Sequence, residues 1–337
     1  MSLRALAVLA LVVLAGCGSK TVEREPSLVA SDSARTTPAQ PGAPQPSGAV
    51  RIAVVTHGQA SSAFWAIVRN GVESAARQMD VLVDYRAPDI YSVDRMRELI
   101  DRAIASKPDG LVVSLPEPAV APAVERAVRA GIPVVSINSG SSDFRKLGVL
   151  AHVGQIEGRA GLQAGQRLAD AGVRRALCVI QQAGNVGLQQ RCAGLARAMR
   201  AAGGRSSQLL VDDQASDTPD RIAAAITRER IDGVLSLNAT TGLQTVEAVR
   251  ASHRAGLVKI GTFDLGPDVL RAVLDRTISF AVDQQAFLQG YLPIVFLTER
   301  ARYGLFPAQG DVVATGPHFV TRENAAKALE LSKRSIR

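Results

Sequence analysis

The sequence predicts an α/β protein with two lobes, each a doubly wound parallel sheet, joined by a hinge of several strands. Beyond residue 50, short apolar runs alternate with segments of helical periodicity, the pattern of a parallel sheet covered on both faces. The pattern also repeats, because residues 108–115 (PDGLVVSL) have a counterpart in residues 231–238 (IDGVLSLN). A chain of 337 residues is long enough for two such lobes.

The N-terminal region is typical of an exported protein. Arg4 precedes an apolar run over residues 5–15 that is too short to span a bilayer comfortably, so residues 1–16 are predicted to be a signal peptide. The run ends in Leu-Ala-Gly-Cys, which resembles the bacterial lipobox and implies a lipid on Cys17. Residues 17–48 are rich in small and polar residues and are expected to form a flexible tether. We therefore expect a lipid-anchored protein of the cell envelope.

Composition and motifs argue against several function classes. The net charge is +8, but no run reaches five or six like charges, so we expect a solvated basic surface and no nucleic-acid partner. The four histidines lack metal-ligand spacing, so no metal is expected. The sequence contains no dinucleotide fingerprint, phosphate loop or nucleophile elbow. We expect neither an enzyme nor a cofactor.

The first lobe is expected to comprise residues 49–155 and 285–315. Short runs of β-branched residues predict its strands. Ser62 is placed to cap the helix that follows the first strand. Strands are predicted over residues 50–55, 82–85, 111–114, 134–137 and 312–314. Four helices are predicted: one that starts at residue 62 or 63, one over 93–105, one that ends near 130, and one over 287–303 that is interrupted at Pro293.

The second lobe is expected to comprise residues 156–284 and 316–337. Four helices are predicted: one that ends near residue 171, one that starts near 185, one around 246–249 and one over 322–333. Strands are predicted over residues 176–180, 234–237 and 278–282, and another strand ends at 264. Exported cysteines favour disulfides, so Cys178 and Cys192 are disulfide candidates, and two buried thiols are the alternative.

The ends of the predicted strands carry the candidate ligand site. Parallel strands finish at one edge of a sheet, and open α/β folds bind ligands there. Asn138 and Asp264 end corresponding strands of the two repeats, so they are expected to approach one ligand from opposite sides. Phe64 and Trp65 either line this site or pack the helix start. Aromatic faces, amides, one carboxylate and one guanidinium suit a small polyhydroxylated ligand. The candidates are Phe64, Trp65, Ser114, Asn138, Ser139, Gln155, Arg191, Asn238, Phe263, Asp264 and Gln284.

Over residues 50–336 the chain resembles the solute-binding proteins of bacterial ABC importers for simple sugars, in the ribose-binding branch. The resemblance implies a type I periplasmic binding protein fold, a sugar or polyol gripped between the lobes, delivery to an ABC permease, and no metal or cofactor. It implies ligand contacts for the candidates above, and for Ser62. Asn138-Ser139 replaces the Asp-Arg pair of ribose binders, which makes ribose itself doubtful. We expect a monomer.

Other functions on the same fold remain open. The chain is also compatible with a lipoprotein that presents ligand to a sensor kinase or chemoreceptor, or with a binder of nucleosides or a signalling furanone. A sugar-responsive repressor of this fold would begin with a helix-turn-helix instead of residues 1–17. An enzyme is the remaining alternative.

Overall fold

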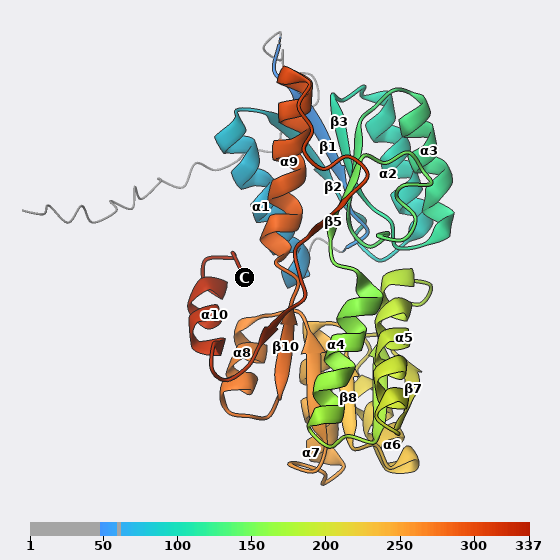
Figure 1. Ribbon diagram of the computed structural model, residues 1–337, viewed down its shortest axis with the longest axis vertical. Helices are drawn as coiled ribbons and strands as arrows, with labels where there is room; N and C mark the ends of the chain where they lie inside the picture. Colours follow the sequence, from blue (N-terminus) through green and yellow to red (C-terminus); the bar gives the residue numbers. More distant parts are fainter. Residues whose placement is uncertain (1–47, 59–61) are drawn as a thin grey trace, which may run out of the picture. The chain divides into compact units, whose positions relative to one another are not determined.

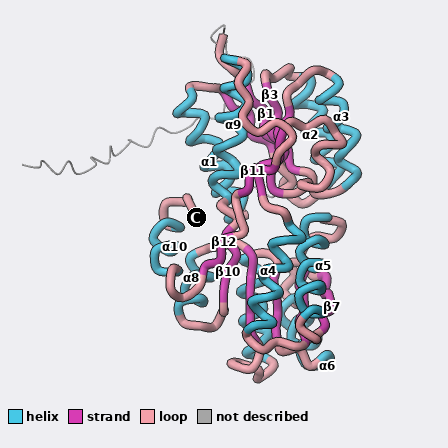
Figure 2. Tube along the Cα trace, in the orientation of Figure 1, coloured by secondary structure: helices cyan, strands magenta, loops and turns pink. Residues whose placement is uncertain are grey.

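Two six-stranded sheets organise the chain in the computed structural model, which describes residues 48–58 and 62–337 (Figures 1 and 2). The predicted signal peptide, Cys17 and residues 17–47 of the expected tether lie outside the described residues. Among the residues that are described, no helix has the length and apolar character needed to cross a bilayer.

The first sheet forms the core of the first lobe, and all its strands are parallel. Its order is β11-β5-β4-β3-β1-β2. The central strands are fully buried, as expected for a parallel sheet with both faces covered. The strands are β1 (Arg51–Val55), β2 (Leu82–Arg86), β3 (Gly110–Ser114), β4 (Val134–Asn138), β5 (Ala151–Gly154) and β11 (Val312–Ala314).

Helices cover both faces of the first sheet. One face packs against α1 (Ala63–Met79) and α9 (Ala286–Tyr303), which lie side by side in Figure 1. The other face packs against α2 (Val93–Ala105) and α3 (Ala121–Arg129), which follows the short 3-10 helix Pro118–Val120. The apolar stripe of each helix therefore finds its cover on the sheet, which is what the helical periodicity predicts.

The second sheet repeats the layout of the first. Its order is β12-β10-β9-β8-β6-β7, so β6 to β10 occupy the places of β1 to β5. Only β12 runs antiparallel, against β10. The strands are β6 (Arg175–Ile180), β7 (Arg205–Leu210), β8 (Gly233–Ser236), β9 (Lys259–Phe263), β10 (Phe280–Asp283) and β12 (His318–Val320).

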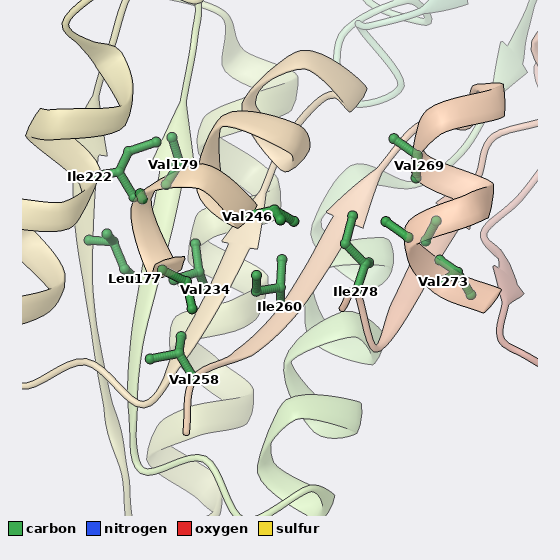
Figure 3. Packing of buried hydrophobic residues seen from close by; sticks show 14 of the residues in the cluster. Leu177, Val179, Ile222, Val234, Val246, Val258, Ile260, Val269, Val273 and Ile278 are labelled. Atoms are coloured by element: carbon green, nitrogen blue, oxygen red, sulfur yellow. The ribbon is translucent and has the colours of Figure 1, made fainter. Parts of the chain in front are cut away.

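The second sheet is also sandwiched between helices. One face carries α4 (Glu157–Asp170) and α5 (Val186–Ala201). Figure 3 shows the aliphatic core on the opposite face, where valines, isoleucines and leucines from sheet and helices interdigitate. The helices of that face are α6 (Thr218–Glu229), α7 (Ala239–Ala251), α8 (Pro267–Leu274) and α10 (Ala325–Ser332). The predicted class of two parallel-sheet α/β lobes is confirmed.

Three chain segments connect the two sheets: those after β5, after β10 and after β11. They carry Gln155, Gln284 and Thr315, which are fully or almost fully buried. Gln155 Nε2 donates to Gln284 Oε1 at 3.2 Å, so two of the crossings are bonded to each other. The expected lobe boundaries fall at these crossings, and a hinge there stays a prediction.

Several elements differ from the sequence-based expectation. Helix α9 runs through Pro293 without a break, so the expected interruption is wrong. Ser62 occupies the N-cap position of α1, but its side chain makes no capping hydrogen bond. Three strands and two helices had no predicted counterpart: β5, β7, β12, α6 and α8. Strand β7 reads RSSQLL and lies at a half-exposed sheet edge, so it lacks the apolar run that identifies a buried strand.

Candidate ligand-binding site

A cavity of about 570 Å³ lies where residues at the strand ends of both sheets meet. Its two walls differ in chemistry. All the aromatic side chains that line it among the described residues come from the first lobe, namely His57, Phe64, Trp65 and Tyr91. The charged lining side chains come from the second lobe, namely Arg191, Asp212, Asp213 and Asp264. The cavity thus presents a flat, largely apolar wall opposite a wall of charges and amides.

The rings of the aromatic wall pack on one another. Trp65 meets Phe64 edge to face at 5.2 Å between ring centroids, and His57 at 4.9 Å. Trp65 is only 6% exposed and also packs into the core between the first sheet and α1. The two interpretations of this aromatic pair are therefore compatible, since Trp65 packs the helix start and lines the cavity.

His57 follows β1 and is almost fully buried. Its Nδ1 lies 2.8 Å from Ser114 Oγ, and its backbone N–H donates to the same oxygen at 3.0 Å. Burial, aided by the charge of Arg191, lowers the pKa of His57 to about 3. The ring is therefore neutral at neutral pH.

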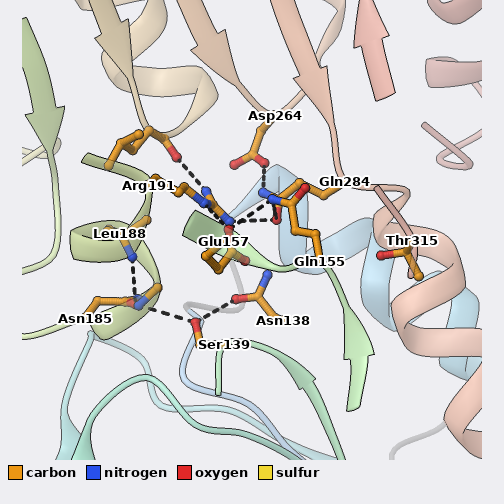
Figure 4. Close-up of polar contacts among 12 residues, drawn as sticks. Asn138, Ser139, Gln155, Glu157, Asn185, Leu188, Arg191, Asp264, Gln284 and Thr315 are labelled. Atoms are coloured by element: carbon orange, nitrogen blue, oxygen red, sulfur yellow. Dashed lines mark hydrogen bonds and ion pairs between the residues drawn. The ribbon is translucent and has the colours of Figure 1, made fainter. Parts of the chain in front are cut away.

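Arg191 is held in place by partners from other elements of the second lobe (Figure 4). Its Nε donates to Glu157 Oε2 at 2.5 Å, and one terminal nitrogen donates to Gln284 Oε1 at 2.8 Å. The guanidinium also stacks on the Phe263 ring at 4.2 Å. A Cβ at Gly161 would lie 2.0 Å from the Arg191 carbonyl oxygen, so this glycine lets α4 and α5 approach closely enough for the ion pair. The pair is buried on both sides.

Asp264 follows β9 and lies beside Gln284, whose Nε2 donates to its carboxylate (Figure 4). Burial raises the pKa of Asp264 to about 6, although the positive charge of Arg191 and the bond from Gln284 oppose that rise. Asp264 lines the cavity, and its carboxylate can accept more hydrogen bonds than the one from Gln284. It accepts hydrogen bonds from ligand hydroxyl groups most strongly when it is charged.

The loops of the second lobe supply further acceptors. Asn238 caps α7 through Oδ1, which accepts from Thr241 N at 2.8 Å, and its Nδ2 donates to Asp213 Oδ2 at 2.7 Å. Asp212 is exposed and its Oδ1 accepts from Gln214 N at 3.0 Å. Neither aspartate is in an ion pair among the described residues. This side of the cavity is rich in acceptors.

Direct contacts between the lobes close the structure beside the cavity. Val186 N, at the start of α5, donates to Pro116 O at 2.9 Å. Ser139 Oγ donates to Asn185 Oδ1 at 3.5 Å (Figure 4), and Gln190 Nε2 donates to Ser142 Oγ at 3.3 Å. The structure therefore represents a form in which the two lobes touch.

Comparison with known proteins identifies the family. A model described as the periplasmic binding protein domain matches residues 52–304. The chain belongs to this family. A carbohydrate transporter of Acidothermus cellulolyticus, solved in complex with myo-inositol, is 33% identical and has a TM-score of 0.80, with 86% of this chain and 100% of that chain covered.

Two curated relatives are less similar in sequence. A xylose/arabinose-binding protein of Sulfolobus acidocaldarius is 25% identical over 294 residues, covering 80% of this chain and 71% of that protein. A D-ribose/D-allose-binding protein of Pseudomonas aeruginosa is 29% identical over 210 residues, covering 58% of this chain and 64% of that protein.

Most of the predicted site residues of this periplasmic binding protein line the cavity. Ser114, Gln155 and Phe263 are fully buried and are absent from the cavity wall. Each supports a lining side chain instead: Ser114 supports His57, Gln155 supports Gln284, and Phe263 supports Arg191. The predicted residues that line the cavity are Ser62, Phe64, Trp65, Asn138, Ser139, Arg191, Asn238, Asp264 and Gln284.

Sequence reasoning missed part of the wall. His57 follows the first predicted strand, so the rule of strand ends would have found it. Asp212 and Asp213 follow β7, whose strand signal is weak. Glu157 does not line the cavity and is recognisable as part of the site only from its contact with Arg191. The lining residues that had not been predicted include His57, Tyr91, Gln181, Gln182, Asn185, Asp212, Asp213, Gln214 and Thr240.

The two inner cysteines lie together in the second lobe. Cys178 on β6 and Cys192 on α5 are joined by a disulfide, with Cα atoms 5.7 Å apart. Both residues are buried, and the bond ties the helix that carries Arg191 to the sheet. Within residues 48–58 and 62–337 no cluster of three metal-ligating side chains occurs.

Proposed function

We propose that this protein captures a sugar or polyol in the cavity between its two lobes and delivers it to an ABC permease. The observation that carries the proposal is the division of the cavity into an aromatic wall and a wall of carboxylates, amides and one guanidinium. The aromatic rings cover the C–H face of a sugar ring, while the opposite wall meets its hydroxyl groups.

The magnitudes fit such a ligand. A hydrogen bond to a charged group contributes about 1.5–3 kcal/mol net. Arg191 and Asp264 offer bonds of this kind, and neutral lining amides such as Asn138 and Gln284 offer hydrogen bonds of about 0.5–1.5 kcal/mol each. After ordering costs, a few such bonds reach micromolar affinity, which corresponds to about 8 kcal/mol.

The family supports the ligand class. The relatives named above are a xylose/arabinose-binding protein, a D-ribose/D-allose-binding protein and a transporter protein solved with myo-inositol. Asn138 and Ser139 present neutral groups where ribose binders carry an Asp-Arg pair. We therefore favour a pentose other than ribose, a hexose or a cyclic polyol as the ligand.

The proposed cycle has the ligand bridging the lobes, so that the closed form is favoured over the open form and docks on the permease as a monomer. Binding drives closure only if the ligand contacts both walls at once. Gln284 lies at a chain crossing and lines the cavity, so closure and ligand contact are coupled at this residue. The signal peptide would direct export and be removed. The lipid on Cys17 would then hold the protein at the membrane, in the periplasm or at the outer face of the cytoplasmic membrane.

A thermal-shift screen of the purified protein tests the proposal. The panel contains myo-inositol, D-xylose, D-arabinose, D-ribose, D-allose and common hexoses, with nucleosides as comparison. A ligand present at about a hundredfold its dissociation constant stabilises the folded state by about 2.7 kcal/mol. At least one sugar or polyol is expected to raise the melting temperature. Stabilisation by nucleosides alone would contradict the proposed ligand class.

A further inference from the structure

His57 is bonded to Ser114 through Nδ1 of its ring, and it lines the cavity. Its Nδ1 and its backbone N–H both face Ser114 Oγ, at 2.8 and 3.0 Å. Ser114 is fully buried, and its hydroxyl has no other partner among the described residues. The ring stands edge to face with Trp65 and Tyr91 and lines the cavity with them.

This geometry determines which ring nitrogen carries the hydrogen. Ser114 Oγ already accepts the backbone N–H of His57, so its hydroxyl hydrogen needs an acceptor, and Nδ1 is the acceptor in reach. If Nδ1 carried a hydrogen instead, the serine hydroxyl would be left as a buried donor without a partner, which is costly. In a neutral imidazole the hydrogen then sits on Nε2.

No described residue accepts a hydrogen bond from His57 Nε2. The cavity is where an acceptor can be supplied, because His57 lines it. We propose that His57 is a specificity-determining residue that donates its Nε2–H to one oxygen atom of the bound sugar or polyol. This inference rests on the proposed function.

The donor complements the opposite wall. The lining carboxylates, Asp212, Asp213 and Asp264, all belong to the second lobe, so the hydroxyl hydrogens of a ligand are accepted there. In the first lobe, His57 instead donates a hydrogen bond to a ligand oxygen beside Trp65. A neutral imidazole with hydrogen on Nε2 offers no acceptor to the cavity, so it discriminates against a ligand with a methylene or an ammonium at this position.

The test is ¹⁵N NMR of the protein labelled at histidine, which contains four histidines. Two-bond correlations between nitrogen and ring protons report the tautomer of each ring, and His57→Gln assigns the His57 signals. The probe is whichever of myo-inositol, D-xylose and D-arabinose stabilises the wild-type protein. His57 is expected in the Nε2–H form without the probe, and its Nε2 signal is expected to shift with slowed hydrogen exchange when the probe binds.

The chain supplies an internal control. His152 Nδ1 lies 3.0 Å from Ser136 Oγ, so it forms a second serine–histidine pair, but it is fully buried away from the cavity. The signals of His152 should be unchanged by the probe. Equal shifts at both rings would report a general change of the lobe and overturn the inference.

Two variants complete the test. His57→Phe keeps a ring but removes the donor, and we expect about three- to tenfold weaker binding of the probe. His57→Gln places an amide N–H near the former Nε2 and should recover most of the affinity. In His57→Phe the hydroxyl group of Ser114 is left without an acceptor. The double variant Ser114→Ala/His57→Phe removes that hydroxyl group, and it should bind the probe as weakly as His57→Phe.

The outcomes separate the two proposals. If no sugar or polyol binds the wild-type protein, the proposed function fails. If the probe binds while His57 carries its hydrogen on Nδ1, or its Nε2–H is already protected and unmoved by the probe, the proposed function stands and the role of His57 is refuted. Unchanged affinity of His57→Phe would refute it as well.

Discussion

Asn138 and Asp264 occupy equivalent places in the two lobes. Asn138 ends β4 and Asp264 follows β9, the corresponding strand of the second sheet, and both have left-handed backbones with φ of 62° and 67°. Asn and Asp tolerate this conformation better than other non-glycine residues. Both residues line the cavity, so one structural device, repeated in the two halves, aims an amide and a carboxylate at the same space.

Asp264→Asn is expected to stabilise the protein at alkaline pH. The pKa of Asp264 is raised by burial from 3.8 to about 6, so its charged form costs stability above pH 6, and protonation removes that cost as the pH falls. The variant should gain on the order of 2 kcal/mol in the free energy of unfolding at pH 8, and the gain should vanish below about pH 4. Urea unfolding across this range measures it. The exposed Asp89→Asn is the control, and a less stable Asp264→Asn protein at pH 8 would contradict the account.

Ligand affinity should weaken in mild acid. Asp264 accepts ligand hydroxyl groups best when charged, so protonation near pH 6 removes a strong acceptor. His57 does not titrate in this range because its pKa is lowered to about 3. Calorimetric titration with the binding sugar should show about three- to tenfold weaker binding at pH 5 than at pH 7.5. Asp264→Asn should show a flat profile, and a pH dependence that survives in this variant would assign the titration to another group.

The buried ion pair of Arg191 and Glu157 predicts a non-additive result. Arg191→Met leaves the Glu157 carboxylate buried without its partner and should cost about 3–5 kcal/mol of stability. Adding Glu157→Gln should restore most of that stability but no ligand binding, because the guanidinium remains absent. Arg69→Met breaks an exposed pair on α1 and should cost less than about 1 kcal/mol. Equal losses for the buried and the exposed pair would contradict this assignment.

The disulfide between Cys178 and Cys192 should contribute to stability. It closes a loop with a sequence separation of 14, for which chain entropy predicts about 3 kcal/mol. Reductant should lower the urea midpoint of the wild-type protein and leave that of Cys178→Ala/Cys192→Ala unchanged. Alkylation of both cysteines in unfolded, unreduced protein, detected by mass spectrometry, would show that the bond is absent.

The fold was predictable because its signals are local and repeated. The Asp-Gly turns before β3 and β8 reveal the duplication, and the apolar runs of β1, β4 and β6 mark buried parallel strands. Short or exposed elements carry no such pattern. Strand β5 has four residues, and β7 alternates weakly at a sheet edge.

The site was predictable where it depends on strand ends. Asn138, Asp264 and Gln284 line the cavity because parallel strands deliver their last residues to one edge. Whether such a side chain reaches the cavity or is buried behind its wall cannot be predicted from the neighbouring residues in the sequence. Phe263 and Gln155 are buried behind the cavity wall, and Arg191 reaches Glu157 because α4 and α5 pack closely at Gly161.

Fluorescence of Trp65 tests the central claim most directly, because it is the chain's single tryptophan and lines the cavity. Titration with the stabilising sugar or polyol should give a saturable change in emission at one ligand per chain, with reduced acrylamide quenching. The same titration of Asp264→Asn, altered on the opposite wall, should need a higher ligand concentration. A ligand that stabilises the protein yet leaves Trp65 emission unchanged, or binds Asp264→Asn equally well, would contradict binding between the two walls.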